Sequence, residues 1–253
     1  MTAVTAGQAT AAPLTRRILN VLRLHIANPW QTLITPWLVY AAIFGASVAI
    51  WYAVVVAAGG RDQIEADAFS SNGGSSWIFV YMMVIAIQAM NLTFSFALGL
   101  GMTRRDYYLG TAAYFVALSV MYAAGITALA GVETATDGWG VGGSFFASWP
   151  VGDLASWQQF LVHFLLAMLF VFFGAAAGSV WVRWRSLGLY LFLGAILAVG
   201  IAWVWATTAT DSWGAVGGFF TDNSVLRIVS WTVPVTLAAG VAGYLFLRRA
   251  TPK

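Results

Sequence analysis

The sequence predicts an all-α, polytopic membrane protein with six transmembrane helices, and three observations lead to that class. Hydrophobic residues make up 60% of the 253 residues and charged residues only 8%, whereas soluble domains carry about 25% charged residues. Six long runs contain no Asp, Glu, Lys or Arg. Each run is continuously apolar, unlike the alternating strands of a membrane β-barrel. The composition therefore argues against a soluble enzyme and against a disordered chain.

The first predicted elements precede the membrane. Residues 1–13 are small and polar and predict a disordered cytoplasmic tail, and residues 14–28 predict a short helix with Thr15 as its N-cap. This helix carries Arg16 and Arg23 on one side and an apolar stripe on the other. A basic amphipathic helix beside a span is expected in the headgroup layer, where arginines meet anionic lipid. The alternative is a soluble cytoplasmic helix without a partner.

The remaining elements are the spans of a single transmembrane domain, 14–253. A helix needs about 20 apolar residues to cross a bilayer. The runs that satisfy this length are 33–57, 76–100, 111–130, 157–180, 187–208 and 228–247.

The distribution of charge predicts the orientation. With the N-terminus inside, ten of the twelve basic residues lie inside, and only Arg61 and Arg227 lie outside. Eight of the nine acidic residues lie outside, and Asp106 is the exception. Lys and Arg are retained on the cytoplasmic side, so both termini are expected in the cytoplasm. Eleven Arg against one Lys suggest a GC-rich bacterial genome, and the expected location is the bacterial cell (inner) membrane.

The chain lacks the residues that most membrane chemistry requires. It has no Cys and only two His, so no cofactor or metal site is expected. A P-loop needs a Lys at the phosphates, and the only Lys is Lys253. Inside the spans His163 is the one candidate for carrying a proton, and no Gly-x-Ser-Gly or H-E-x-x-H motif is present. We therefore expect no enzymatic activity in the chain itself, and we expect no nucleic acid partner.

The turn between the second and third spans is the most informative stretch. Thr103 is expected to cap a short helix, with Asp106 three residues later. Arg104 and Arg105 would then lie at that helix's N-terminus, where the dipole disfavours them, so lipid phosphate or an acidic partner should compensate. Tyr107 and Tyr108 would supply an interfacial surface; the same residues also fit an ordinary positive-inside turn.

The run from Ser95 to Thr111, S-F-A-L-G-L-G-M-T-R-R-D-Y-Y-L-G-T, resembles type-2 permease subunits of bacterial ATP-binding cassette (ABC) exporters. The run D-G-W-G-V-G-G-S-F-F, from Asp137 to Phe146, is similar to a segment of the actinobacterial members. The six-span plan with an amphipathic N-terminal helix also fits, although these two motifs cover only about thirty residues.

The resemblance implies a permease that forms a homodimer, or a heterodimer with a sister permease, and binds two separate ATPase subunits that hold the ATP and Mg. It implies export of amphipathic or hydrophobic small molecules or lipids. The turn after the second span would be the coupling helix docked on the ATPase. The residues concerned are Thr103, Arg104, Arg105, Asp106, Tyr107 and Tyr108.

Polar residues in the second span predict a translocation path. Gln88, Asn91 and Ser95 are spaced by three and four, so they share one helix face. The resemblance implies a path at the dimer interface, lined by spans two and five. The candidates are Phe79, Met83, Gln88, Asn91, Ser95, Trp203 and Thr207. The alternative is that Gln88 and Asn91 hydrogen-bond neighbouring helices.

Two outer loops resemble each other, Asp137–Phe146 and Asp211–Phe220. Together they would form a lid over the exit, or two interfacial loops without a gating role. Their aromatic residues are Trp139, Phe145, Phe146, Trp213, Phe219 and Phe220. An alternative function uses the same loops: a non-transporting binding or immunity protein that captures a hydrophobic ligand at the outer face.

Overall fold

The computed structural model describes residues 13–250, and all regular structure in this part of the chain is helical. The tail predicted at 1–13 lies outside the described residues except for Pro13, which is the N-cap of the first helix in place of Thr15. The main helices are α1 (Leu14–Ile26), α2 (Thr35–Ala58), α3 (Trp77–Gln88), α4 (Phe94–Gly99), α5 (Arg104–Ala135), α6 (Ser156–Ala209), α7 (Trp213–Asp222), α8 (Val225–Ser230) and α9 (Thr232–Leu247). Short η segments are Trp30–Ile34, Arg61–Gln63, Gly73–Ser76, Ala89–Thr93 and Gly138–Gly142.

Five helical segments in the described part are long and apolar enough to cross a bilayer, so the protein is a polytopic helical membrane protein. They are Trp30–Ala58, Gly73–Gly99, Arg104–Ala135, Ser156–Ala209 and Val225–Leu247. The fourth contains both the fourth and the fifth predicted span. Its backbone leaves helical geometry at Arg185, where φ is 57° and ψ is −146°. Two helices therefore meet at this residue.

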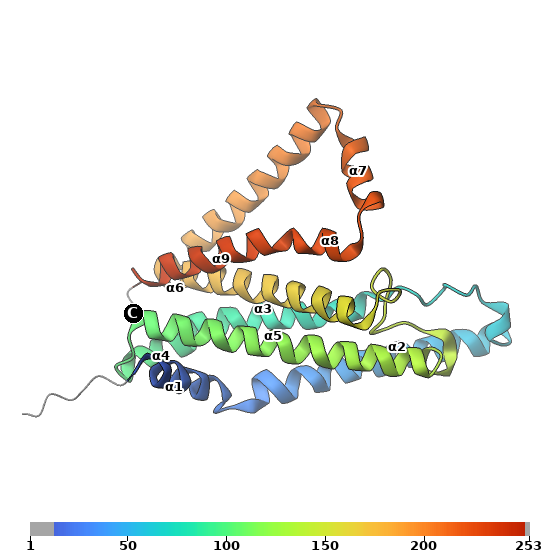
Figure 1. The fold of residues 1–253 in the computed structure, drawn as a ribbon, viewed down its shortest axis with the longest axis horizontal. Coiled ribbons are helices and arrows are strands. Elements are labelled where there is room, and N and C mark those ends of the chain that lie inside the picture. The colour runs from blue at the N-terminus through green and yellow to red at the C-terminus, as the bar shows by residue number, and fades with distance from the viewer. Residues whose placement is uncertain (1–12, 251–253) are drawn as a thin grey trace, which may run out of the picture.

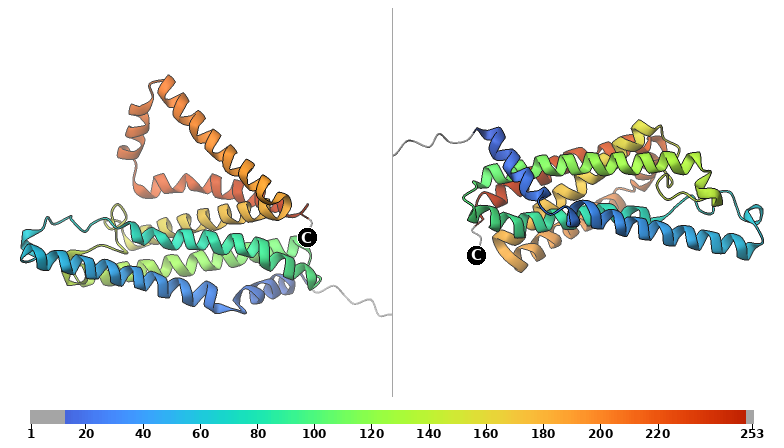
Figure 2. Two further views of the ribbon diagram at one scale, coloured as in Figure 1. Left: turned by 180° about the vertical axis from the view of Figure 1, so that it is seen from behind. Right: turned by 90° about the horizontal axis from the view of Figure 1, so that it is seen from below.

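The first half of α6 is the centre of the bundle. It packs against α3, α5 and α9, and Figures 1 and 2 show these helices running alongside one another. A Cβ added to Gly174 would lie 2.4 Å from the Met83 carbonyl oxygen, and one added to Gly178 would lie 2.9 Å from that of Ile87. These two glycines allow α6 to approach α3 closely, as the small-residue spacing predicts.

The second half of α6 leaves the bundle. We call the break in helical geometry at Arg185 the elbow of α6. Figure 1 shows the second half in orange, rising away from the bundle until α7 and α8 return the chain to α9. Its side chains are exposed almost throughout, and Tyr190 and Trp205 keep more than 70% of their surface.

Two wide helical turns interrupt the second and first spans, at Ala89–Thr93 and Trp30–Ile34. Such π-type turns free or misalign backbone carbonyls, and tyrosine hydroxyls bond to them. Tyr107 Oη donates to the Ala89 carbonyl at 2.6 Å, Tyr122 Oη to Thr32 at 2.9 Å, and Tyr81 Oη to Gln31 at 2.8 Å. The span predicted at 76–100 thus forms one helical segment, Gly73–Gly99, with a wide turn at Ala89–Thr93 that the sequence did not predict.

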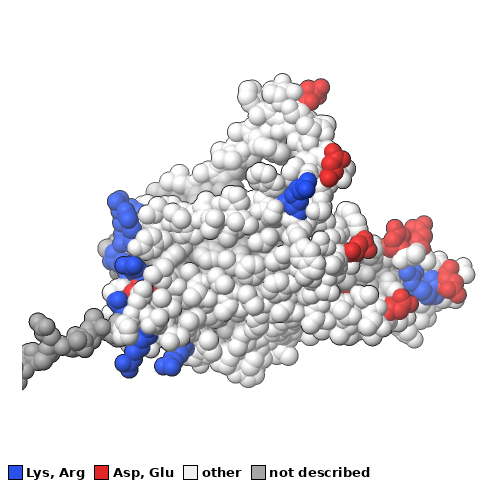
Figure 3. Space-filling model, viewed as in Figure 1, with Lys and Arg blue, Asp and Glu red and all other residues white. Residues whose placement is uncertain are grey.

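Basic and acidic side chains lie mostly at opposite ends of the bundle. Arginines gather at the end where α1, the start of α5, the elbow of α6 and the end of α9 meet, and acidic residues gather mostly at the opposite end (Figure 3). We call these the basic end and the acidic end.

Candidate functional site

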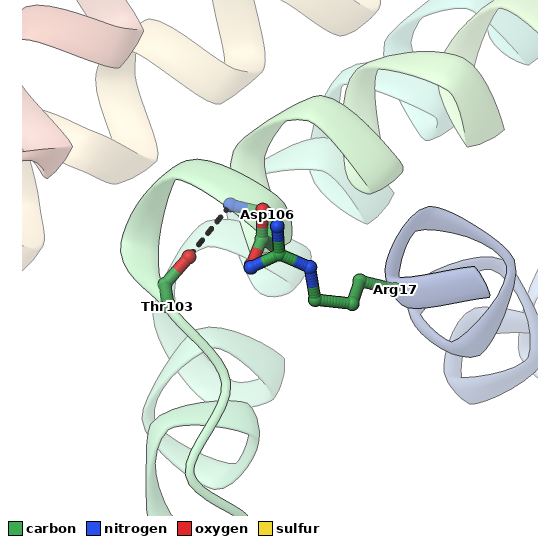
Figure 4. Close-up of polar contacts among 3 residues, drawn as sticks. All are labelled: Arg17, Thr103 and Asp106. Atoms are coloured by element: carbon green, nitrogen blue, oxygen red, sulfur yellow. Dashed lines mark hydrogen bonds and ion pairs between the residues drawn. The ribbon is translucent and has the colours of Figure 1, made fainter. Parts of the chain in front are cut away.

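At the basic end α1 is attached to the first turns of α5 by contacts one helical turn apart. Arg17 Nη1 donates to Asp106 Oδ2 at 2.7 Å, the one ion pair within residues 13–250 (Figure 4). Four residues further along each helix, Val21 packs on Gly110, where an added Cβ would lie 2.5 Å from the valine Cβ. Arg17 is therefore held by protein, whereas the arginines of this helix were expected to meet lipid.

The next contact in this series is made by His25. Its Nε2 lies 2.9 Å from Thr111 Oγ1, and its ring stacks on Tyr114 with centroids 4.7 Å apart. Burial lowers the pKa of His25 from 6.5 to about 4, because the charged imidazolium loses its hydration. His25 is thus a neutral packing residue at physiological pH.

The predicted coupling turn is the start of a long helix. Thr103 Oγ1 accepts a hydrogen bond from the Asp106 amide at 3.1 Å, which confirms it as an N-cap (Figure 4). The helix it caps is α5, which continues to Ala135, so the separate short helix is wrong. Tyr107 and Tyr108 are 0% and 6% exposed, so the interfacial surface predicted for them is also wrong. Their hydroxyls bond to backbone carbonyls of neighbouring helices, which draws them into the bundle.

Arg104 and Arg105 have different surroundings. Arg104 Nη1 donates to the Arg248 carbonyl at 2.9 Å, at the C-terminus of α9. The Arg104 side chain, which the dipole disfavours at the N-terminus of α5, is thus stabilised by the negative end of the α9 dipole. Lipid phosphate or an acidic partner was expected to provide this stabilisation. The exposed Arg105 lines a groove between α5, α6 and α9.

The tip of this turn is the part that projects freely. Leu100 is 59% exposed, and Gly101 has a φ of 80° that reverses the chain between α4 and α5. Thr103 is also exposed. The docking roles predicted for Arg104 and Arg105 stay predictions, whereas Asp106, Tyr107 and Tyr108 are buried and not available to a partner in this conformation.

The path candidates are not brought together within one chain. Gln88 lines a polar cavity of about 120 Å³ that also contains His25, Asn28, Thr32 and Tyr114, between α1, α3 and α5. Gln88 is exposed, and within residues 13–250 neither Gln88 nor Asn91 makes a side-chain hydrogen bond to a neighbouring helix, so the path and the helix-contact interpretations both stay predictions.

The other candidates are spread over the length of the second span and over the second half of α6. Phe79 is buried against His163 and Phe170 of α6, with centroids 6.3 and 5.9 Å away. Met83 lines an apolar cavity of about 350 Å³ with residues of α6 and α9. Asn91 is half-buried and Ser95 is exposed, bonding to the Asn91 carbonyl at 3.1 Å. Trp203 and Thr207 lie on the second half of α6, where the threonine hydroxyl bonds to the Trp203 carbonyl at 2.7 Å.

The first outer loop is organised by a carboxylate that lies three residues beyond the predicted third span. Glu133 is 2% exposed, and its oxygens accept four N–H groups of the loop. These are Trp139 Nε1 at 2.7 Å and the amides of Phe145, Phe146 and Ala147 at 2.9, 3.1 and 2.8 Å. Sequence reasoning passed over Glu133; its signal is a lone carboxylate at a span end before a glycine-rich loop.

This anchored loop contains an unusual backbone. Asp137, Gly138, Trp139 and Gly140 all have positive φ, which forms one left-handed turn. Such a turn costs energy at Asp137 and Trp139, and the bonds to Glu133 hold it. Phe145 and Phe146 are buried against α2 in the same arrangement.

The second outer loop has a different structure, so the internal similarity does not extend to conformation. Trp213, Phe219 and Phe220 lie on or near the exposed surface of α7, and Trp213 packs edge-on against Trp203 at 5.9 Å. A capture surface shared by both loops is not formed, because Phe145 and Phe146 of the first loop are buried and Trp139 is half-buried.

Within residues 13–250 no three His, Cys, Asp or Glu side chains are placed to hold a metal ion. His163 is buried, and its Nδ1 lies 2.7 Å from the Gln159 carbonyl. It thus has a partner inside its own helix and packs against Phe79.

Comparison of the chain with family models, curated proteins and solved structures finds no match.

Proposed function

We propose that this chain is the membrane-spanning permease subunit of an ABC exporter. Two copies, or one copy and a sister permease, would assemble with two ATPase subunits that bind ATP and Mg and hydrolyse the ATP. The observation that carries the proposal is the projecting turn at the basic end, whose sequence resembles the coupling region of these permeases. We assign amphipathic or hydrophobic small molecules or lipids as cargo, because the candidate path residues offer aromatic and amide groups without charge.

We propose six crossings with both termini in the cytoplasm of a bacterial cell membrane. A straight helix of 54 residues would be about 81 Å long, against about 30 Å of hydrocarbon. The break at Arg185 supports two crossings in its place. Both described ends of the chain, α1 and α9, reach the basic end, and an even number of crossings accounts for this.

The contact with the ATPase is assigned to the tip of the turn, Leu100 to Thr103. Leu100 is apolar and exposed beyond the last turn of α4, where it would seat in a groove of the ATPase. ATP-driven closure of the ATPases would then move α4 and α5 together, because the turn between them is short. Buried Asp106 and Tyr107 would transmit this movement to α1 and to the wide turn of the second span.

The test is Leu100→Glu, compared with Arg16→Glu at the same end of the molecule. Both residues are exposed, so both variants should fold. We expect Leu100→Glu to lose ATPase binding and transport-linked hydrolysis, and Arg16→Glu to retain both. Equal activity of the Leu100→Glu complex and the unaltered complex would reject the docking role of the tip.

A further inference from the structure

A second feature of the basic end lies on the side of the bundle. A groove with a volume of about 440 Å³ runs between α5, α6 and α9, and its walls are almost entirely apolar. The lining residues are Arg105, Tyr108, Leu109, Met168, Phe172, Thr236, Leu237, Gly240, Val241 and Tyr244. Among them only Arg105 carries a charge, and it lies at the basic end of the groove.

The floor of the groove is firmly built. A Cβ added to Gly240 would lie 3.2 Å from the Phe172 ring, and one added to Gly243 would lie 3.0 Å from Tyr108 Oη. The Tyr108 hydroxyl donates to the Gly240 carbonyl, so the polar groups of the floor are paired. The groove therefore has a closely packed floor onto which a flexible apolar chain can pack.

The mouth of the groove opens toward the surrounding membrane. Leu237 and Val241 of α9 keep 65% and 60% of their surface. From Tyr244 to Thr236 the groove extends over two helical turns, about 12 Å along α9. Its long axis thus follows the direction in which lipid tails lie.

Within residues 13–250 no protein group compensates the charge at the end of the groove. Arg105 makes no hydrogen bond or ion pair with any residue between 13 and 250, in contrast to Arg104 and Arg17. Asp106, the acidic residue nearest in sequence, is buried and already paired with Arg17. A guanidinium beside an apolar groove at the headgroup level is complementary to an acidic headgroup with an acyl tail.

We propose that this groove is a binding site for one anionic phospholipid, with its phosphate on Arg105 and one acyl tail against Phe172, Leu237 and Val241. The lipid belongs to the leaflet at the basic end. The site is separate from the candidate path residues, none of which lines it, and it requires no ATPase.

The test uses the purified chain in detergent, titrated with phosphatidylglycerol or phosphatidylcholine and read by native mass spectrometry. We expect one phosphatidylglycerol to bind about fivefold more tightly than phosphatidylcholine, the preference that one arginine near the surface confers. Arg105→Gln should abolish the preference, and the control Arg227→Gln, which removes the charge of an exposed arginine on α8, should keep it. Val241→Trp, which fills the mouth at an exposed position, should weaken both lipids.

Three outcomes would overturn the proposal. Equal affinity for both lipids in the unaltered chain would show that no acidic headgroup is recognised. Displacement of the lipid by millimolar glycerol phosphate would show a phosphate site without a tail. A dimer that excludes phosphatidylglycerol, and that Val241→Trp dissociates, would show that a second copy of the chain covers the groove.

Discussion

At the residue scale, single polar groups in this apolar protein act by ordering backbone. Glu133 accepts four N–H groups and fixes the first outer loop, and Tyr81, Tyr107 and Tyr122 donate to carbonyls of the wide turns at Trp30–Ile34 and Ala89–Thr93. Water is scarce in such surroundings, so an unpaired backbone group costs more here than at a soluble surface. We therefore expect substitutions of these groups to act locally on the backbone they hold.

Glu133→Gln tests this at the outer loop. The amide nitrogen of Gln cannot accept, so at least one donor among Trp139 and the amides of residues 145–147 loses its partner, at a cost of about 1–3 kcal/mol. We expect hydrogen exchange at amides 145–147 to accelerate by about tenfold or more, with the helices unchanged. Asp62→Asn, a neutralised carboxylate that is exposed at the same end, is the control. Unchanged exchange at 145–147 would refute the anchoring role.

His25 gives the protein a pH dependence whose sign follows from its lowered pKa. When α1 is separated from α5, the exposed His25 imidazole binds a proton below its ordinary pKa of 6.5. When α1 is packed on α5, the buried imidazole binds a proton only near pH 4. Acid therefore favours the form in which α1 is separated from α5. The free energy that holds α1 on α5 falls by up to roughly 3 kcal/mol as the pH drops from 6.5 toward 4. We expect the Tm in detergent to fall between pH 7.5 and 5, and to fall less in His25→Gln. An identical fall in both proteins would contradict this account.

At the element scale, close helix approach depends on particular glycines. Gly110 of α5 lets Val21 of α1 approach so closely that any side chain would collide. Gly131 on the same helix has open space around its Cβ position. The two glycines are therefore a matched pair on one helix.

Gly110→Ala should destabilise the docking of α1 by about 1–3 kcal/mol through overpacking. Gly131→Ala should be neutral or stabilise by up to about 1 kcal/mol, because Ala favours helix over Gly. Hydrogen exchange within α1 measures the docking directly. Equal protection of α1 in the two variants would show that the Val21–Gly110 contact does not hold it.

The sequence predicts the positions of the helices better than the contacts between them. Apolar length alone locates the helices, because a span must satisfy its backbone internally. It does not reveal the turns at Ala89–Thr93 and Trp30–Ile34, since a π turn has no composition signature of its own. Nor could it show that Tyr107 and Tyr108, adjacent to two arginines, turn inward, because their partners are carbonyls far along the chain.

At the scale of the whole molecule, the two ends of the bundle have different characters. At the acidic end, Glu133 and the buried Phe145 and Phe146 fix the first outer loop. At the basic end lie α1, which Arg17 attaches to α5, the projecting turn before α5 and the open groove beside α9. The second half of α6 leaves the bundle with its apolar surface exposed. A chain with so much exposed apolar surface is suited to assembly with lipid and with further subunits, as the proposed role of an ABC exporter permease requires.

The most direct test of that assignment is co-purification in mild detergent with the ATPase encoded beside this gene, reading complex mass and ATP hydrolysis together. The account predicts a stable complex of two permease copies, or of one copy and a sister permease, with two ATPases, whose hydrolysis depends on this chain. A chain that purifies alone, and neither binds nor stimulates the ATPase, would contradict it.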